Sequence, residues 1–285
     1  MPPLAIFLLF LSASMHALWN LLLKSADEKY IAMGWQVILS GLFAFGFILA
    51  AGLPPRSMWG WAVLSMALET VYFILLCIAY NDGDFSLVYP IARGGAPALL
   101  VLWSALFLHE KLTAGGYLGL AMITGGMMVI GATTLIQNRG AAKPHLRSIL
   151  TALAVAFIIS VYTFVDGRAV KNGPALQYGL LMFTMMPFAT TPFLAYRHGW
   201  GAFGRVWKNN SKYLLFGGAL GLAAYMLALF AYAFAPLSYS GAIREVSAVI
   251  GAFLGWKFLQ EEMGGVRVAG SAIVFAGVMV IAVFG

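Results

Sequence analysis

Long apolar runs separated by short polar stretches fill the sequence. Each run has about 20 residues, the length that an α-helix needs to cross the hydrocarbon core of a bilayer. The pattern predicts an all-α membrane protein with ten transmembrane helices at residues 4–23, 31–51, 59–80, 86–108, 116–136, 148–169, 177–196, 213–234, 237–258 and 266–284.

A polar stretch at residues 137–147 divides these runs into five and five. Pro144 disfavours a helix there. We therefore expect a first five-helix repeat at residues 1–140 and a second at residues 141–285. Because each half has an odd number of crossings, the second half must enter the membrane upside down relative to the first. This inverted-topology repeat is typical of many secondary transporters.

The two halves also match residue by residue. Residues 89–131 align with residues 240–282 without a gap, and Arg93 falls on Arg244 at an offset of 151 residues. Two arginines at equivalent points of duplicated apolar segments predict a polar site at the interface of the repeats, since an arginine facing lipid is costly. The same offset pairs Leu108 with Leu259, Glu110 with Glu261, Gly119 with Gly270, Gly126 with Gly277, and residues 128–130 with 279–281.

Composition supports the membrane assignment. Hydrophobic residues make up 62% of the chain and charged residues 9%, against about 25% charged residues in a soluble domain. The net charge of +7 comes from Lys and Arg residues scattered over the loops. The positive charge therefore reflects which loops lie on the cytoplasmic side and their contact with anionic lipid headgroups. We expect no nucleic-acid partner.

The loops differ in positive charge according to the side on which they lie. The loops after the odd-numbered runs carry 11 Lys and Arg residues, and those after the even-numbered runs carry four. The positive-inside rule places the first set in the cytoplasm. Both termini are then expected on the non-cytoplasmic side.

Local motifs add a family resemblance. The fourth run ends in Leu108-His109-Glu110-Lys111-Leu112-Thr113 before a glycine-rich fifth run, and the second half repeats the cue as Leu259-Gln260-Glu261-Glu262. With ten short helices and a five-plus-five duplication, the chain resembles the EamA-type drug/metabolite transporter superfamily over essentially its whole length. The resemblance implies a pathway between the halves, lined by runs 1, 3, 4, 6, 8 and 9, with runs 5 and 10 at the periphery.

The arginines have informative neighbours. Pro97 lacks the N–H that would bond to the carbonyl of Arg93, so it is expected to kink the fourth helix and free backbone groups for a ligand. Arg244 and Glu245 are adjacent and point about 100° apart on a helix. One of them can face a cavity while the other pairs with a neighbouring helix. Both arginines could instead have structural roles, Arg93 by snorkelling and Arg244 through an ion pair.

Glu69 lies near the middle of the third run, where a carboxylate needs a partner or a proton. Tyr72 follows at i+3 on the same face. Glu69 is the candidate proton carrier or the group that holds a substrate cation. The alternative is a fixed salt bridge to Arg93 or Arg244.

Other side chains could line the site. His16 is either a proton relay or a hydrogen-bonded core residue, and Asp166 and Arg168 are expected at the membrane interface. Aromatic side chains in membrane helices more often serve packing. The candidate substrate-binding residues are Trp19, Asn20, Glu69, Tyr72, Arg93, Tyr162, Tyr225, Arg244 and Glu245.

These features favour a secondary transporter of a small zwitterionic or anionic metabolite, such as an amino or organic acid, with proton coupling through Glu69. The alternatives are an exporter of drugs or quaternary-amine cations, and a non-transporting membrane subunit. No HExxH, GxSxG, Walker-type loop or Cys/His cluster occurs, so we expect no enzyme activity, cofactor or metal. We expect a monomer or weak homodimer, in the inner (plasma) membrane of a bacterium.

Overall fold

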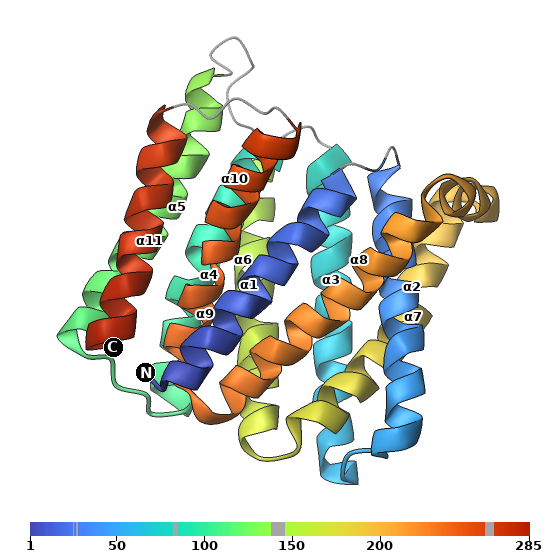
Figure 1. Ribbon diagram of the computed structural model, residues 1–285, viewed down its shortest axis with the longest axis horizontal. Helices are drawn as coiled ribbons and strands as arrows, with labels where there is room; N and C mark the ends of the chain where they lie inside the picture. The colour runs from blue at the N-terminus through green and yellow to red at the C-terminus, as the bar shows by residue number, and fades with distance from the viewer. Residues whose placement is uncertain (25, 27, 82–84, 138–145, 260–264) are drawn as a thin grey trace.

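A computed structural model describes the chain except residues 25, 27, 82–84, 138–145 and 260–264. Residues 138–145 of the polar stretch that divides the halves, and Glu261, thus fall outside the described residues. Helices α2, α3, α4, α5 and α11 run roughly along one direction of the bundle, α1 and α8 cross it diagonally, and both termini lie at the same end (Figure 1). The helices are α1 (Pro3–Lys24), α2 (Lys29–Ala51), η1 (Arg56–Met58), α3 (Trp59–Asn81), α4 (Phe85–Phe107), α5 (Ala114–Gln137), α6 (Leu146–Lys171), α7 (Ala175–His198), α8 (Trp200–Phe234), α9 (Leu237–Arg244), α10 (Val246–Leu259) and α11 (Gly265–Phe284).

The all-α fold with ten membrane crossings is confirmed. Six helical segments among the described residues are long and apolar enough to cross a bilayer, three shorter apolar segments lie in α4, α5 and α11, and α9 with α10 makes the remaining crossing. Large apolar side chains on the outside of the bundle, such as Leu49 and Phe188, are exposed by 72% and 80%. Such a surface fits lipid and not water.

Two predicted boundaries were wrong. The eighth helix begins at Trp200 and not at residue 213, because residues 200–212 form an amphipathic extension whose Lys and Arg residues lower its hydropathy. Its 35 residues span about 52 Å, well beyond a hydrocarbon core of about 30 Å. The gold start of α8 is seen end-on at the upper right of Figure 1, while the rest crosses the bundle diagonally.

The ninth crossing was predicted as one helix, but it divides into α9 and α10 at Glu245. By contrast α4, which carries Pro97, runs as one helix from Phe85 to Phe107. The interruption therefore falls directly after Arg244, in the repeat that has no proline at this point. The break consists of Glu245 alone, whose N–H donates to the carbonyl oxygen of Ala242 at 3.1 Å.

The packing of the helices obeys an inverted two-fold symmetry. If α1 to α5 correspond to α6, α7, α8, α9 with α10, and α11, the most extensive contacts between helices have their counterparts. Helix α1 packs on α8 as α6 packs on α3, and α2 packs on α8 as α7 packs on α3. Helix α4 packs on α6 as α9 and α10 pack on α1. The self-equivalent pairs α2 with α7 and α5 with α11 also pack together.

The glycines of α5 and α11 show the inversion at the level of single residues. A Cβ at Gly119 would lie 2.7 Å from the carbonyl oxygen of Gly277, and one at Gly277 would lie 2.7 Å from that of Gly119. Gly126 and Gly270 approach each other in the same way, at 2.8 and 2.9 Å. Gly119 thus meets the repeat equivalent of Gly126, and Gly126 meets the equivalent of Gly119. This reciprocity is the signature of a two-fold interface between antiparallel helices.

Candidate functional site

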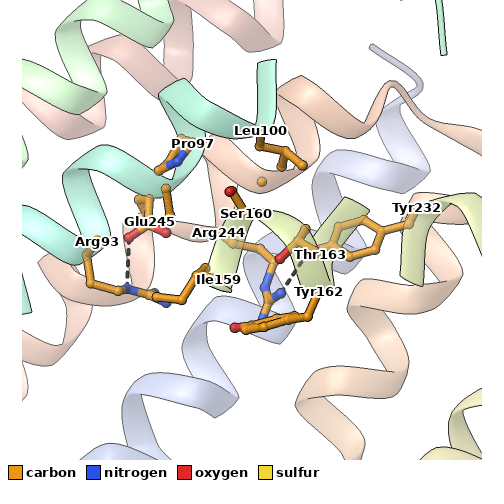
Figure 2. Close-up of a pocket in the computed structure, with 12 residues that line it drawn as sticks. Arg93, Pro97, Leu100, Ile159, Ser160, Tyr162, Thr163, Tyr232, Arg244 and Glu245 are labelled. Atoms are coloured by element: carbon orange, nitrogen blue, oxygen red, sulfur yellow. Dashed lines mark hydrogen bonds and ion pairs between the residues drawn. The ribbon is translucent and has the colours of Figure 1, made fainter. Parts of the chain in front are cut away.

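A buried ion pair joins the repeats. Nε of Arg93 on α4 lies 3.0 Å from Oε2 of Glu245, and the two side chains are exposed by only 10% and 5%. Nη2 of Arg93 also donates to Oγ of Ser247 on α10, at 2.9 Å. Figure 2 shows the pair at one side of a small pocket. The charge of Arg93 is therefore balanced by a fixed partner from the second repeat.

Arg244 has a different environment at the end of α9. Its Nη1 donates to the hydroxyl of Tyr232 at 2.7 Å. Its guanidinium carbon lies 5.3 Å from the ring centroid of Tyr225 and 5.9 Å from that of Tyr232. In the described part of the chain, no carboxylate lies within ion-pair distance of Arg244. Arg244 is thus a cation held by aromatic side chains.

Two carboxylates lie on the other side of Tyr225. Asp166 on α6 is fully buried, and its Oδ1 accepts a hydrogen bond from the hydroxyl of Tyr178 at 2.6 Å. The hydroxyl of Tyr225 donates to the other carboxylate oxygen of Asp166. Glu69 on α3 lies near both Asp166 and the hydroxyl of Tyr225. Tyr225 therefore connects the carboxylates with Arg244.

The pocket between the repeats is small. Its walls come from α4, α6, α8 and α9, and its cavity volume of about 20 Å³ is enough for about one water molecule. A metabolite needs several hundred Å³, so binding requires the helices to move apart. The lining residues are Arg93, Ala96, Pro97, Leu100, Ile159, Ser160, Tyr162, Thr163, Tyr232, Gly241, Arg244 and Glu245 (Figure 2).

Most of the expected site residues gather around this pocket or beside it. Arg93, Tyr162, Arg244 and Glu245 line it. Tyr72 packs edge-on against Tyr162, with ring centroids 6.0 Å apart. Helix α1 supplies the remaining expected residues.

On α1, Trp19 stacks on His16 at 5.2 Å. His16 itself is near both arginines. The amide of Asn20 donates to the backbone oxygen of His16 at 3.0 Å. Asn20 therefore bonds within its own helix, and no contact among the described residues brings it into the cluster.

The sequence analysis misplaced one residue of this site, Asp166, and missed two others, Tyr178 and Tyr232. The expectation that Asp166 lies at the membrane interface is wrong, because α6 continues to Lys171 and Asp166 is fully enclosed. The sequence did contain an indication that Asp166 faces the site, because Tyr162 and Asp166 share one helix face at i and i+4. Tyr232 shares a face with Tyr225 at i+7, whereas nothing in the sequence singled out Tyr178.

The salt bridge from Glu69 to Arg93 or Arg244, the alternative to its role as a proton carrier, does not form among the described residues. Arg93 pairs with Glu245 instead. The expected peripheral placement of the fifth and tenth helices agrees with Figure 1, where α5 and α11 pack side by side at one edge of the bundle.

Fold and site together define an integral membrane protein of two inverted five-helix repeats that enclose charged residues where they meet. A model of the EamA-like transporter family matches residues 3–132 and 146–283. The chain belongs to this family, so it is a membrane transporter of the EamA type.

Comparison of folds supports the same architecture. A solved structure titled "Crystal structure of protein" superimposes with a TM-score of 0.79 at 18% identity, covering 98% of this chain and 97% of the other. At this identity the likeness concerns the fold alone. No curated protein matches the sequence.

Proposed function

We propose that the protein is a secondary transporter that moves a small anionic or zwitterionic metabolite, such as an amino or organic acid, by alternating access. Its location in this proposal is the inner (plasma) membrane of a bacterium. One observation carries the proposal. Arg244 stands at the interface of the repeats with two tyrosines around it and no carboxylate at ion-pair distance in the described residues. A substrate carboxylate is the natural partner for this guanidinium.

The charges of the site favour an anion over a cation. Glu245 neutralises Arg93, which leaves the positive charge of Arg244 facing the pocket. A cationic substrate would be repelled there. A zwitterion could place its carboxylate on Arg244 and its ammonium toward Glu69 and Asp166, beyond the ring of Tyr225.

Alternating access follows from the symmetry of the fold. Two inverted repeats can exchange conformations, so that a pathway open at one end becomes a pathway open at the other. The pocket, whose volume of about 20 Å³ is too small for a metabolite, then corresponds to a state without substrate. Substrate would enter when the helices of one repeat move away from those of the other.

Proton coupling would use the carboxylate pair. Two carboxylates that share a site in a medium of low dielectric constant hold a proton between them more readily than two negative charges. The hydroxyl of Tyr225 can donate to only one acceptor at a time. An anion that binds Arg244 would change the field at Tyr225 and, through it, the preference of Glu69 and Asp166 for the proton.

The test begins with binding. Thermal unfolding of the purified protein is measured with a panel of amino acids, hydroxy acids, keto acids and quaternary amines, because a ligand at 100 times its Kd stabilises the native state by about 2.7 kcal/mol. We expect a carboxylate compound to stabilise the protein. Arg244→Gln should weaken its binding roughly 10- to 100-fold, the loss of a charged hydrogen bond, while Glu28→Gln at an exposed ion pair should not.

Transport of the identified ligand is then measured in proteoliposomes. Glu69→Gln should abolish uptake driven by a pH gradient but retain exchange of labelled for unlabelled ligand. Stabilisation by quaternary amines alone would contradict the proposal and favour a cation exporter. Flux that equals the flux of empty liposomes for every ligand that binds would favour a non-transporting subunit.

A further inference from the structure

The connection between α4 and α5, residues 108–113, carries a carboxylate that reaches into the second repeat. Oε1 of Glu110 accepts hydrogen bonds from the N–H of Leu237 at 2.8 Å and from Nζ of Lys171 at 3.1 Å. Oε2 accepts from the N–H of Ser238 at 3.1 Å and from its hydroxyl at 2.8 Å. One side chain of the first repeat therefore holds the end of α6 and the start of α9.

Helix α9 needs this contact because it has no cap of its own. Pro236 stands at its N-cap position and offers no side-chain hydrogen bond. The first N–H groups of a helix lack partners inside the helix, and a negative charge there is favourable. Glu110 supplies both the acceptors and the charge from a position 127 residues away in the chain. Arg244 ends the same eight-residue helix, about 10 Å from Leu237.

The backbone before Glu110 aims its side chain. His109 adopts a φ of 54°, the left-handed conformation that is uncommon for a residue with a Cβ. The N–H groups of Leu108 and Glu110 both donate to the carbonyl oxygen of Ser104, at 3.0 and 3.1 Å. This C-terminal cap ends α4 and turns the chain toward α9. The hydrogen bonds on either side of His109 hold its backbone in this uncommon conformation.

Neighbouring contacts extend the same junction. The N–H of Thr113 donates to the hydroxyl of Tyr239 on α9 at 2.9 Å, and the Thr113 hydroxyl donates to the carbonyl oxygen of Phe284 at 2.5 Å. Gly116 packs directly under the ring of Tyr239, where no side chain would fit. Both repeats thus meet tightly at the end of the molecule where the termini lie.

The carboxylate of Glu110 is held in its charged form. Burial by itself would raise the pKa of Glu110, but the N–H groups of Leu237 and Ser238, the Ser238 hydroxyl and the charge of Lys171 outweigh burial and lower it below the ordinary value of 4.5. At neutral pH the cap is therefore a negative charge opposite a positive helix end.

We infer that Glu110 is a positioning residue for Arg244 and the latch that keeps the repeats together at the end carrying the termini. The inference rests on the proposed alternating access. Glu110 belongs to the first repeat and all four of its donors belong to the second. An opening of the pathway at this end separates the repeats there, so it must break these bonds. The start of α9, and with it the arginine at its other end, is then released.

The test measures access to the pocket without any ligand. Thr163, a buried residue of the pocket wall, is replaced by cysteine in protein whose single native cysteine, Cys77, is alanine. A charged, membrane-impermeant thiol reagent is applied to each face of oriented vesicles in turn. Glu110→Gln should speed labelling about fivefold from the face that carries the termini, the factor expected for loss of a helix cap. Labelling from the opposite face should not become faster.

Three control variants distinguish the loss of the Glu110 contacts from a general destabilisation of the protein. Lys171→Gln leaves the cap of α9 in place and should have a smaller effect than Glu110→Gln. Ser238→Ala removes one of the four bonds and should speed labelling about twofold. Glu28→Gln breaks an exposed ion pair with Arg205, of 3.4 Å, and should change nothing.

Unchanged labelling in Glu110→Gln, or equal acceleration from both faces, would overturn the inference. If the Glu110→Gln protein does not insert into the membrane, Ser238→Ala provides the test instead. Labelling of the Ser238→Ala protein at the same rate as the protein without that substitution would then overturn the inference. Because no ligand is used, failure of the latch is distinguishable from failure of the proposed substrate class, which only the binding measurements test.

Discussion

Breaking the ion pair between Arg93 and Glu245 should strongly destabilise the protein. Glu245→Gln keeps the shape of the side chain but leaves a guanidinium that is only 10% exposed without its counter-charge. Removing one partner of a buried pair costs about 3–5 kcal/mol. The exposed pair of Glu28 and Arg205, with side chains exposed by 40% and 66%, should be worth less than about 1 kcal/mol.

The assay is thermal unfolding of the purified protein in detergent, followed by tryptophan fluorescence. A chain of this size shifts in Tm by about 2–4 °C per kcal/mol, so Glu245→Gln should lower Tm by about 10 °C. Glu28→Gln, the matched control, should lower it by no more than about 3 °C. Arg93→Met combined with Glu245→Gln should recover at least half of the loss, because neither member of this pair then carries a charge.

Two results would refute this reasoning. Glu245→Gln could unfold at the same temperature as Glu28→Gln, which would mean that water or lipid headgroups solvate Arg93. The decrease in Tm of the double variant could also equal the sum of the decreases in the Arg93→Met and Glu245→Gln single variants. The residues would then act independently, and the distance of 3.0 Å between Nε and Oε2 would have no energetic meaning.

Further predictions concern the repeat interface, pH and orientation. Gly119→Ala should destabilise the protein by about 1–3 kcal/mol, since its Cβ would meet the carbonyl of Gly277; Gly125→Ala on the same helix faces open space and should be neutral or stabilising in the same unfolding assay. The stability contributed by ionised Glu110 is complete above pH 4.5 and is lost as pH falls through its lowered pKa. The Tm difference between parent and Glu110→Gln should therefore shrink on acidification, and a constant difference would exclude this role. A C-terminal reporter that fluoresces only in the cytoplasm should stay dark; fluorescence would reverse the assigned orientation.

The sequence predicted the site residues that residue order or hydropathy marks, but it did not predict which helices bring them together. The offset that aligns Arg93 with Arg244 was visible because duplication copies residues in order. Hydropathy alone located Glu69 near the middle of its helix. The pairing of Arg93 with Glu245 could not be derived, because a helical pattern tells which face a residue occupies but not which distant helix lies opposite.

The sequence by itself determined that the chain is a ten-crossing membrane protein of two inverted repeats. Apolar length and residue order suffice for this, because lipid requires every crossing to satisfy its own backbone. Only the tertiary structure decided that Asp166 is enclosed by Tyr178 and Tyr225, and that Glu110 caps α9. These contacts join helices from different parts of the chain. Their partners are set by how the helices pack, which no local pattern records.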